Sequence, residues 1–234
     1  MIAYVVTHYK MPPYRLHDFL LWNDQIFNRP ETRLVIVIDK PLLSLPDYAR
    51  AVVFPKPMDR FALSWTSNYG IRAAMSDGAD IICKTDPDCI IPQELHRRIA
   101  TVKDGHAIAP VYHMAATADH VRRGASTIRP WTASRGTIAM RPSGWQAVHG
   151  YDERMIGYGP EDGDICDRIQ ARGIAIDRAR GAPIYHIAHD SGITQHPAKR
   201  TDHWGRGGIN PENRQEIKAI RRQKNWHNPE WGNF

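Results

Sequence analysis

Short apolar runs alternate with longer amphipathic stretches through the first half of the chain. The runs at 2–8 and 33–39 are rich in β-branched residues and are bounded by polar or turn residues, which is typical of buried parallel strands. The stretch 14–28 between them has apolar residues at helical spacing. Further strands are predicted at 49–55, 79–86 and 106–113, and further helices at 64–77 and 91–105. This alternation predicts an α/β fold in which helices flank a mostly parallel, Rossmann-like central sheet.

The second half of the chain has a less regular pattern. Residues 114–135 are polar and rich in arginine, which fits a loop or a strand pair. Strands are predicted at 136–142 and 182–190, and helices at 143–150, 161–172 and 211–224. The sequence shows neither repeats nor a clear linker, so we expect the C-terminal tail to pack on the domain or on a partner.

Composition limits the class of protein. The chain has 234 residues, 42% of them hydrophobic, which is enough for one sizeable core and predicts a single domain. There is no apolar run of about 18 residues, so we expect no membrane span. The first residues predict a core strand rather than a signal peptide. The three cysteines predict reduced thiols in a cytoplasmic protein, although a Cys83–Cys89 disulfide is an alternative.

The net charge of +6 is unevenly distributed. Residues 112–149 and 199–234 each carry a net charge of +4, whereas residues 150–198 between them carry −3. Basic surface attracts phosphates, acidic lipids or nucleic acid, although a solvated surface explains it equally well.

Two carboxylates, Asp86 and Asp88, follow a buried strand and are one residue apart. Ligands of parallel sheets bind at the carboxyl ends of the strands, where Thr7 and Asp39 also fall. Like charges in a poorly solvated place repel each other, and a shared cation removes that repulsion. Mg²⁺ or Mn²⁺ suits oxygen ligands and would neutralise the charge on a leaving phosphate. By itself the pattern is also typical of a polar turn.

Two later segments carry further polar groups. The segment 157–164, GYGPEDGD, enters a predicted helix with Glu161 and Asp162 in its first turn. These carboxylates either cap the helix or accept a proton from a bound hydroxyl group. His186 and His189 follow the last apolar strand, where neutral imidazoles can join carboxylates on Mn²⁺.

In this order the motifs resemble the GT-A class of nucleotide-sugar glycosyltransferases. The C-terminal half is similar to the galactosyltransferase type, which includes β-1,4-galactosyltransferases and related domains of bacterial polysaccharide polymerases. The family pairs a D-x-D with a later G-(F/Y)-(D/N)-E segment and a G-(W/Y)-G-x-E-D-x-D segment. This chain has GYDE at 150–153 and GYGPEDGDI at 157–165, followed by Arg168-Ile169 and Gly173. The resemblance covers roughly residues 2–190, and it departs from the family at Pro87, which stiffens the D-x-D, and at His149, where many members have glycine.

The resemblance implies roles for the candidate catalytic residues. Asp86 and Asp88 would hold the metal ion and the diphosphate, with His186 as third protein ligand, or His189 in its place. Asp162 would be the general base, and direct attack by the acceptor hydroxyl implies inversion. Glu161 would help to bind the acceptor or the sugar.

The resemblance also implies a set of donor-binding residues. Thr7 and Asp39 would contact the nucleotide base and ribose. Asn68 and Arg72 lie in the segment that precedes the family's D-x-D, and we expect both to contact the donor. Trp131 and Trp145 are candidates for stacking on a sugar, although a tryptophan of the core is the commoner interpretation.

We therefore expect a soluble, Mn²⁺- or Mg²⁺-dependent inverting glycosyltransferase with a UDP-sugar donor and a saccharide or glycoconjugate acceptor. The GT-A domain would span residues 1–198, with a nucleotide-sugar half at 1–111 and an acceptor half at 112–198. Residues 199–234 would form a basic, aromatic tail. Without the stem and anchor of Golgi enzymes, the expected location is the cytoplasm of a bacterium or a phage-infected host.

Three alternatives remain open at this point. The basic stretches suit an enzyme that glycosylates hydroxymethylated pyrimidine bases in DNA, as some bacteriophage enzymes do. A nucleic-acid-binding module on an inactive transferase scaffold is a second alternative. A nucleotidyltransferase is the third, although the loop after the first strand lacks the glycines that such enzymes carry there.

Overall fold

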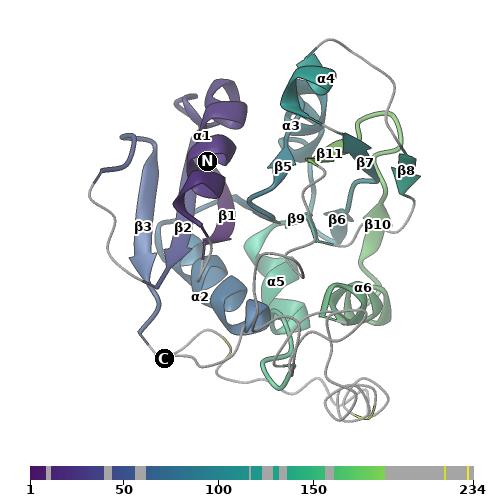
Figure 1. Cartoon of the computed structure of the whole chain (residues 1–234). Helices are drawn as coiled ribbons and strands as arrows, with labels where there is room; N and C mark the ends of the chain where they lie inside the picture. Colours follow the sequence, from purple (N-terminus) through teal and green to yellow (C-terminus); the bar gives the residue numbers. More distant parts are fainter. Residues whose placement is uncertain are drawn as a thin grey trace.

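The computed structural model describes residues 1–8, 12–39, 44–55, 62–115, 117–122, 129–131, 136–155 and 161–187, together with Ala219 and Trp231. Seven strands form the main sheet in the order β10-β6-β9-β4-β1-β2-β3 (Figure 1). They are β1 (Ile2–His8), β2 (Thr32–Ile38), β3 (Ala49–Val53), β4 (Ile81–Thr85), β6 (His106–Ile108), β9 (Ile138–Met140) and β10 (Ala175–Asp177). All pairs are parallel except those of β9, which runs antiparallel to both β4 and β6.

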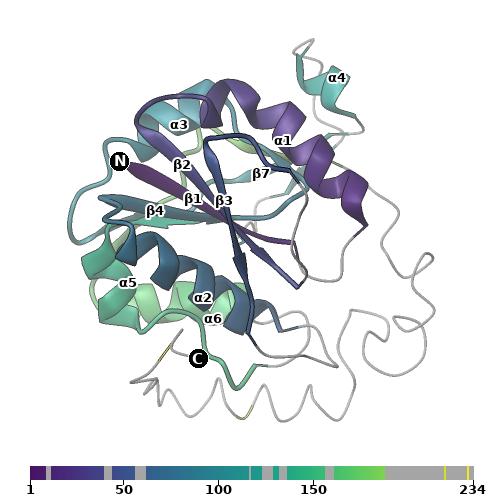
Figure 2. The same cartoon turned by 90° about the vertical axis from the view of Figure 1, so that its left-hand side faces the viewer.

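Helices cover both faces of this sheet, as Figure 2 shows. On one face lie α1 (Pro13–Phe27) and α3 (Gln93–Ile99). On the other lie α2 (Leu63–Ser76), α5 (Pro142–Val148) and α6 (Glu161–Ala171). Successive side chains of a strand point to opposite faces, so Tyr4 of β1 packs with the first helix layer and Val5 with the second. The β1 strand is buried along its whole length, which explains its unbroken apolar run.

A second, smaller sheet has the order β5-β11-β7-β8. Its strands are β5 (Cys89–Ile90), β11 (Ile184–Ile187), β7 (Tyr112–Ala115) and β8 (Arg129–Trp131), and the short helix α4 (Ala118–Arg122) follows β7. The two-residue strand β5 begins four residues after β4 ends, so the Asp86-Pro87-Asp88 turn joins the two sheets.

The structure confirms the long elements and corrects the irregular ones. The run 106–113 was predicted as one strand, but it divides into β6 in the main sheet and β7 in the small sheet. Pro110 lies at the division and has no amide hydrogen to continue a ladder. The helix predicted at 91–105 ends at Ile99, and β8 with α4 occupies part of the segment predicted as a loop or strand pair.

All three cysteines are free and buried, so the alternative Cys83–Cys89 disulfide is wrong. Within the described ranges, none of the helices combines the length and the hydropathy that crossing a bilayer requires. The predicted tail helix lies outside the described residues. Trp231 of the tail is described, and its buried ring joins the core cluster on the α2 side of the sheet.

Candidate active site

The carboxyl ends of three neighbouring strands meet at one edge of the main sheet. In the parallel register, Thr7 of β1 lies opposite Val37 of β2, and Val6 lies opposite Thr85 of β4. Asp39 and Asp86 follow directly after β2 and β4. The structure therefore brings Thr7, Asp39 and Asp86 to the same edge, as the strand pattern predicts.

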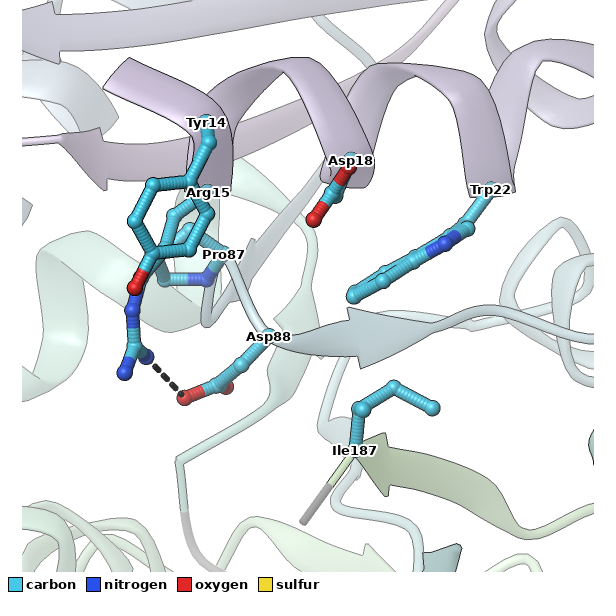
Figure 3. Close-up of a pocket in the computed structure, with 7 residues that line it drawn as sticks. All are labelled: Tyr14, Arg15, Asp18, Trp22, Pro87, Asp88 and Ile187. Carbon is cyan, nitrogen blue, oxygen red and sulfur yellow. Dashed lines mark ion pairs between the residues drawn. The ribbon is translucent and has the colours of Figure 1, made fainter. Parts of the chain in front are cut away.

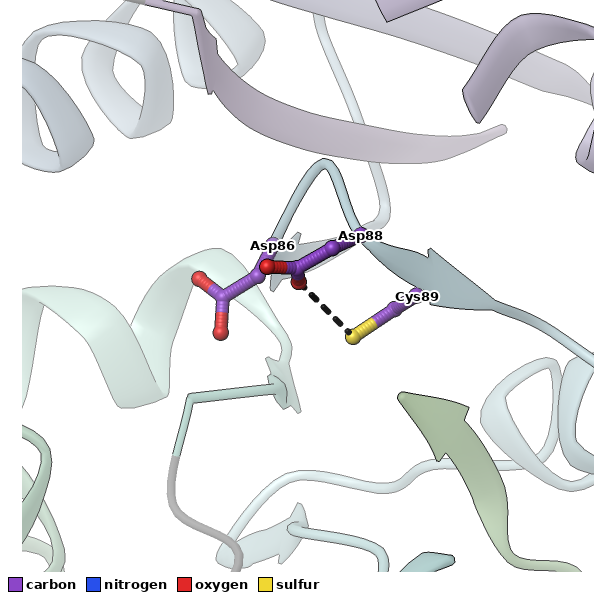
Figure 4. Close-up of side chains that lie close together, drawn as sticks. All are labelled: Asp86, Asp88 and Cys89. Atoms are coloured by element: carbon purple, nitrogen blue, oxygen red, sulfur yellow. Dashed lines mark hydrogen bonds between the residues drawn. The ribbon is translucent and has the colours of Figure 1, made fainter. Parts of the chain in front are cut away.

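The Asp86-Pro87-Asp88 turn is closed by a hydrogen bond from the Cys89 amide to the Asp86 carbonyl oxygen, at 3.2 Å. One oxygen of Asp86, one oxygen of Asp88 and the Cys89 sulfur lie within 4.8 Å of one another. Figure 4 shows the three side chains close together at the turn. Burial, followed by the charges of Asp88 and Asp86, raises the pKa of Cys89 well above its usual value. The thiol therefore stays protonated and donates to Asp88 Oδ1 at 3.7 Å, and the two carboxylates remain as the donors for a hard cation.

His186 lies beside this pair. It belongs to β11, whose antiparallel register places it opposite Cys89, and its Nε2 lies 3.4 Å from Asp88 Oδ2. Burial opposes protonation of the ring, but the hydrogen bond to Asp88 and the two carboxylate charges outweigh it and raise the pKa of His186. Carboxylate oxygen and imidazole nitrogen at this separation fit one Mn²⁺ or Mg²⁺ ion, so the donor set suits the expected metal.

Asp86 has protein donors on both of its oxygens. Lys84 Nζ donates to Oδ1 at 2.7 Å, and the Tyr112 hydroxyl donates to Oδ2 at 3.3 Å. Gly136 passes so close that a Cβ added there would collide with Asp86 Oδ2, and it would lie 2.8 Å from the Tyr112 hydroxyl oxygen. Asp86 is therefore oriented by its surroundings, whereas Asp88 Oδ2 faces His186.

Asp162 is in the first turn of α6, on the opposite side of the main sheet from α1. Its carboxylate lies close enough to the Asp86 surroundings for its charge to act there. Burial is the main cause of the raised pKa values of Tyr112 and Tyr151, and the charge of Asp162 raises both further. Glu161 beside it is buried. The charge of Asp162 therefore acts on residues around Asp86, and its role as the base stays a prediction.

Buried polar contacts hold α6 in place. Arg168 and Asp164 form an ion pair at 2.8 Å with both side chains 1% exposed. Arg168 also donates to the carbonyl oxygen of Val148, at 2.7 Å, and to that of Gly150. These bonds tie α6 to the end of α5, which fixes the position of the helix that carries Asp162.

A cavity of about 200 Å³ lies on the α1 side of the turn. Figure 3 shows Tyr14, Arg15, Asp18 and Trp22 pointing from α1 toward it. Pro87, Asp88 and Ile187 form the rest of its lining. Arg15 lies 3.6 Å from Asp88 Oδ2, so α1 forms one wall of the site and places a positive charge beside the second carboxylate.

The structure confirms none of four predicted donor or sugar contacts, those of Asn68, Arg72, Trp131 and Trp145. Asn68 is fully buried and bonds to the backbone of Tyr151 through both its amide nitrogen and its oxygen. Arg72 lies over the Trp231 ring, 5.5 Å from its centre. These contacts are structural, and a donor contact for either residue stays a prediction.

The two tryptophans differ in what the structure shows of them. Trp145 is completely buried and its indole N–H donates to the Ile82 carbonyl oxygen, so stacking on a sugar is wrong for this residue. Trp131 belongs to β8, but its side chain lies outside the described part, as does the whole of His189. Sugar stacking by Trp131 and metal binding by His189 therefore stay predictions.

The parallel sheet, the aspartate turn at its carboxyl edge and the small sheet beside it define a GT-A fold. Residues 113–190 match a family model described as the N-terminal domain of galactosyltransferase. No curated protein sequence matches the chain.

Two solved structures are similar to the chain over most of its length. One is the catalytic domain of Drosophila beta1,4-galactosyltransferase 7 in complex with xylobiose, with 15% identity, a TM-score of 0.57 and coverage of 84% of this chain and 73% of that chain. The other is a mutant of the same Drosophila enzyme in complex with manganese, UDP-Gal and xylobiose, with 15% identity, a TM-score of 0.56 and coverage of 80% and 71%. The fold is of the galactosyltransferase type, and with the family-model match it supports a glycosyltransferase.

Proposed function

We propose that the chain is a metal-dependent inverting glycosyltransferase that moves a sugar from a UDP-sugar to a hydroxyl group of a saccharide or glycoconjugate. One observation carries the proposal: Asp88 and His186, far apart in sequence, lie 3.4 Å apart at the carboxyl edge of the sheet, and the charge of Asp162 acts on Lys84 beside them. The first two offer ligands of the type that Mn²⁺ accepts, and the third offers a carboxylate base.

The donor half of the reaction would use the turn and the two strands beside it. Asp86, Asp88 and His186 would hold the cation, which would neutralise the diphosphate charge as the nucleotide leaves. Thr7 at the end of β1 and Asp39 after β2 are at the same edge and are available to a nucleotide that extends from the turn.

The acceptor half would use α6. Asp162 would accept the proton of the acceptor hydroxyl as its oxygen attacks the anomeric carbon from the face opposite the leaving diphosphate. A single displacement of this kind inverts the configuration at that carbon. Glu161, buried one residue earlier, would orient the acceptor or the transferred sugar.

The choice of substrates is supported by the similar structures. The Drosophila mutant binds manganese, UDP-Gal and the saccharide xylobiose. The alternative acceptor, hydroxymethylated DNA, depends on the two basic stretches at 112–149 and 199–234, and the second lies almost entirely outside the described residues. We therefore keep DNA as an outcome of the test.

The test is nucleotide release from a panel of sugar nucleotides in the presence of Mn²⁺. Each donor is incubated alone, with a panel of saccharides, with hydroxymethylcytosine-containing duplex DNA and with unmodified DNA. We expect release of UDP without pyrophosphate, stimulated by a saccharide. Stimulation by modified DNA alone would move the acceptor to DNA, and pyrophosphate as product would assign a nucleotidyltransferase. Failure to release nucleotide from any donor would contradict the proposal.

A further inference from the structure

Lys84 is a lysine inside the protein. It is the fourth residue of β4, its exposure is 0%, and its strand is paired on both sides, with β1 and with β9. Its ammonium group donates to Asp86 Oδ1 at 2.7 Å and to the Gly136 carbonyl oxygen at 2.9 Å. It also lies 5.8 Å from the centre of the Tyr151 ring.

A buried ammonium group is costly unless nearby charge compensates for it. The ion pair with Asp86 supplies that compensation. The Gly136 carbonyl oxygen also accepts from the ammonium group, so two hydrogen bonds hold the cation beside Asp86.

Arg15 provides a second cation on the other side of the turn. Its guanidinium group lies 3.6 Å from Asp88 Oδ2, and both side chains are 16% exposed. This is the same oxygen that faces His186. Two cations held by the protein therefore stand beside the two carboxylates.

This arrangement affects how the site receives a divalent cation. Two carboxylates without counter-charges would attract such a cation strongly, whereas these two are already compensated by Lys84 and Arg15. A divalent cation that arrives with a diphosphate brings compensating negative charge of its own. Lys84 and Arg15 repel a bare divalent cation, but they attract the phosphates that accompany it.

We propose that Lys84 and Arg15 are fixed counter-charges of the Asp86–Asp88 pair, which make the site a weak receptor for a bare divalent cation and a strong one for the cation together with a nucleoside diphosphate. The inference rests on the proposed function, because it concerns the same donor site. Binding of metal and nucleotide is then coupled, and the coupling is the same in both directions. Lys84 acts through Asp86 and is a positioning residue.

The test is a titration with Mn²⁺, read from the electron paramagnetic resonance signal of free Mn²⁺, with and without saturating UDP. The proteins are the wild type, Lys84→Met and Arg15→Gln. The control is Arg98→Gln, which removes one positive charge from an ion pair with Asp177 on the surface. Thermal unfolding shows whether each variant is folded.

For the wild type we expect weak binding of Mn²⁺ alone and binding at least about tenfold tighter with UDP. Lys84→Met should bind Mn²⁺ alone about tenfold more tightly than the wild type, with a correspondingly smaller effect of UDP. Arg15→Gln should change in the same direction by a smaller factor, since it is partly solvated, and the control should match the wild type. If Lys84→Met does not fold, Arg15→Gln carries the test.

Two outcomes overturn the inference. Equal binding of Mn²⁺ to the wild type with and without UDP would contradict the coupling, although the proposed metal-dependent transferase would survive. Weaker binding by the variants under both conditions would assign Lys84 and Arg15 a merely structural role. Absence of Mn²⁺ binding to the wild type even with UDP would remove the proposed function and the inference with it.

Discussion

Asp86 and Asp88 are separated by one residue, yet the structure gives their carboxylates different partners. Lys84 and Tyr112 donate to Asp86, whereas Asp88 Oδ2 faces His186 and Arg15. The turn joins β4 to β5, so Asp86 directly follows a strand of the main sheet and Asp88 directly precedes a strand of the small sheet. At the scale of single residues, Asp88 is therefore the carboxylate that can share a cation with an imidazole.

The first prediction concerns Asp88→Asn. The amide is nearly the same size but carries no charge, so the cation loses an anionic ligand. We expect Mn²⁺-dependent binding of UDP, measured by calorimetry, to weaken by about 100-fold or more. Glu94→Gln on the exposed surface of α3 is the matched control. A variant that keeps the wild-type response to Mn²⁺ would exclude Asp88 as a ligand.

The second prediction concerns Asp162→Asn. Because Asp162 is the proposed base for the acceptor hydroxyl, we expect UDP to bind normally while sugar transfer slows by at least about 10²- to 10⁴-fold. Asp167→Asn, later on the same helix, controls for the loss of a charge from α6. Transfer at the wild-type rate by Asp162→Asn would show that another group is the base.

The sequence predicts the acidic residues of the site and misses its cations. Asp86 and Asp88 follow the end of β4, Asp162 lies in the first turn of α6 and His186 lies in β11, and their spacing resembles a known pattern. Lys84 carries one local signal, a single charge within the run IICKT at 81–85. Its partner at Gly136 is 52 residues away, and no local pattern shows that the two meet.

At the scale of elements, α6 depends on a buried ion pair at its centre. Asp164 and Arg168 are one helical turn apart. Arg168 also donates to the carbonyl oxygens of Val148, at the end of α5, and Gly150. The helix is short, at 11 residues, and begins with three acidic residues in its first turn, which the helix dipole favours. Its place against the sheet nevertheless depends on these polar contacts as well as on its apolar side.

The third prediction follows from that pair. Arg168→Met keeps an unbranched apolar stem but removes the guanidinium group, which leaves Asp164 buried without its counter-charge. We expect the free energy of unfolding, measured with urea, to fall by about 3–5 kcal/mol. Arg172→Met, on the exposed end of the same helix segment, should change it by less than about 0.5 kcal/mol. A similar small effect of Arg168→Met would mean that packing alone holds α6.

Elements with a long periodic signal are predicted well, and those with a short one are not. Eight strands and helices run from β1 to α3, and the sequence predicts all of them except β5. That strand has only two residues. The three residues of β10 are likewise too few for alternation to show. The division between β6 and β7 depends on which sheet each half joins, and sequence neighbours do not determine that.

At the scale of the whole molecule, a buried histidine links stability to pH. His96 is 2% exposed in the layer between α3 and the sheet, and its Nδ1 is hydrogen-bonded to the Tyr4 hydroxyl at 2.9 Å. Burial and then Arg29 lower the pKa of His96, and Glu31 only partly offsets them. The native protein therefore holds this imidazole neutral at a pH where the unfolded chain already binds a proton.

The fourth prediction is the resulting pH dependence. Because the native pKa of His96 is lowered, its contribution to stability is fully present above the unfolded pKa of 6.5. This contribution is lost as the pH falls through 6.5 toward the native pKa. We expect His96→Gln to lose less stability than the wild type between pH 7 and pH 5, as measured by urea midpoints. His17→Gln, at an exposed position, should follow the wild type. Parallel curves for His96→Gln and the wild type would contradict the assignment.

The overall architecture could be predicted only in part. The alternation of strands and helices indicates a mostly parallel sheet between helices, and the structure confirms it. The order of the strands and the division into two sheets depend on pairings between distant segments, such as β11 with β5. The apolar pattern shows that a strand is buried, but it does not show which other strands lie beside it.

The antiparallel strand β9 has a consequence for synthesis of the chain. It lies between β4 and β6 although it follows both in sequence, so β4 has an open edge until residues 138–140 leave the ribosome. An open edge can pair with other unfinished chains. The lysine that later serves the donor site lies on that edge, opposite Ile138 in the finished sheet. A charged side chain there discourages edge-to-edge association, so Lys84 would protect the nascent protein from aggregation before it has any ligand to bind.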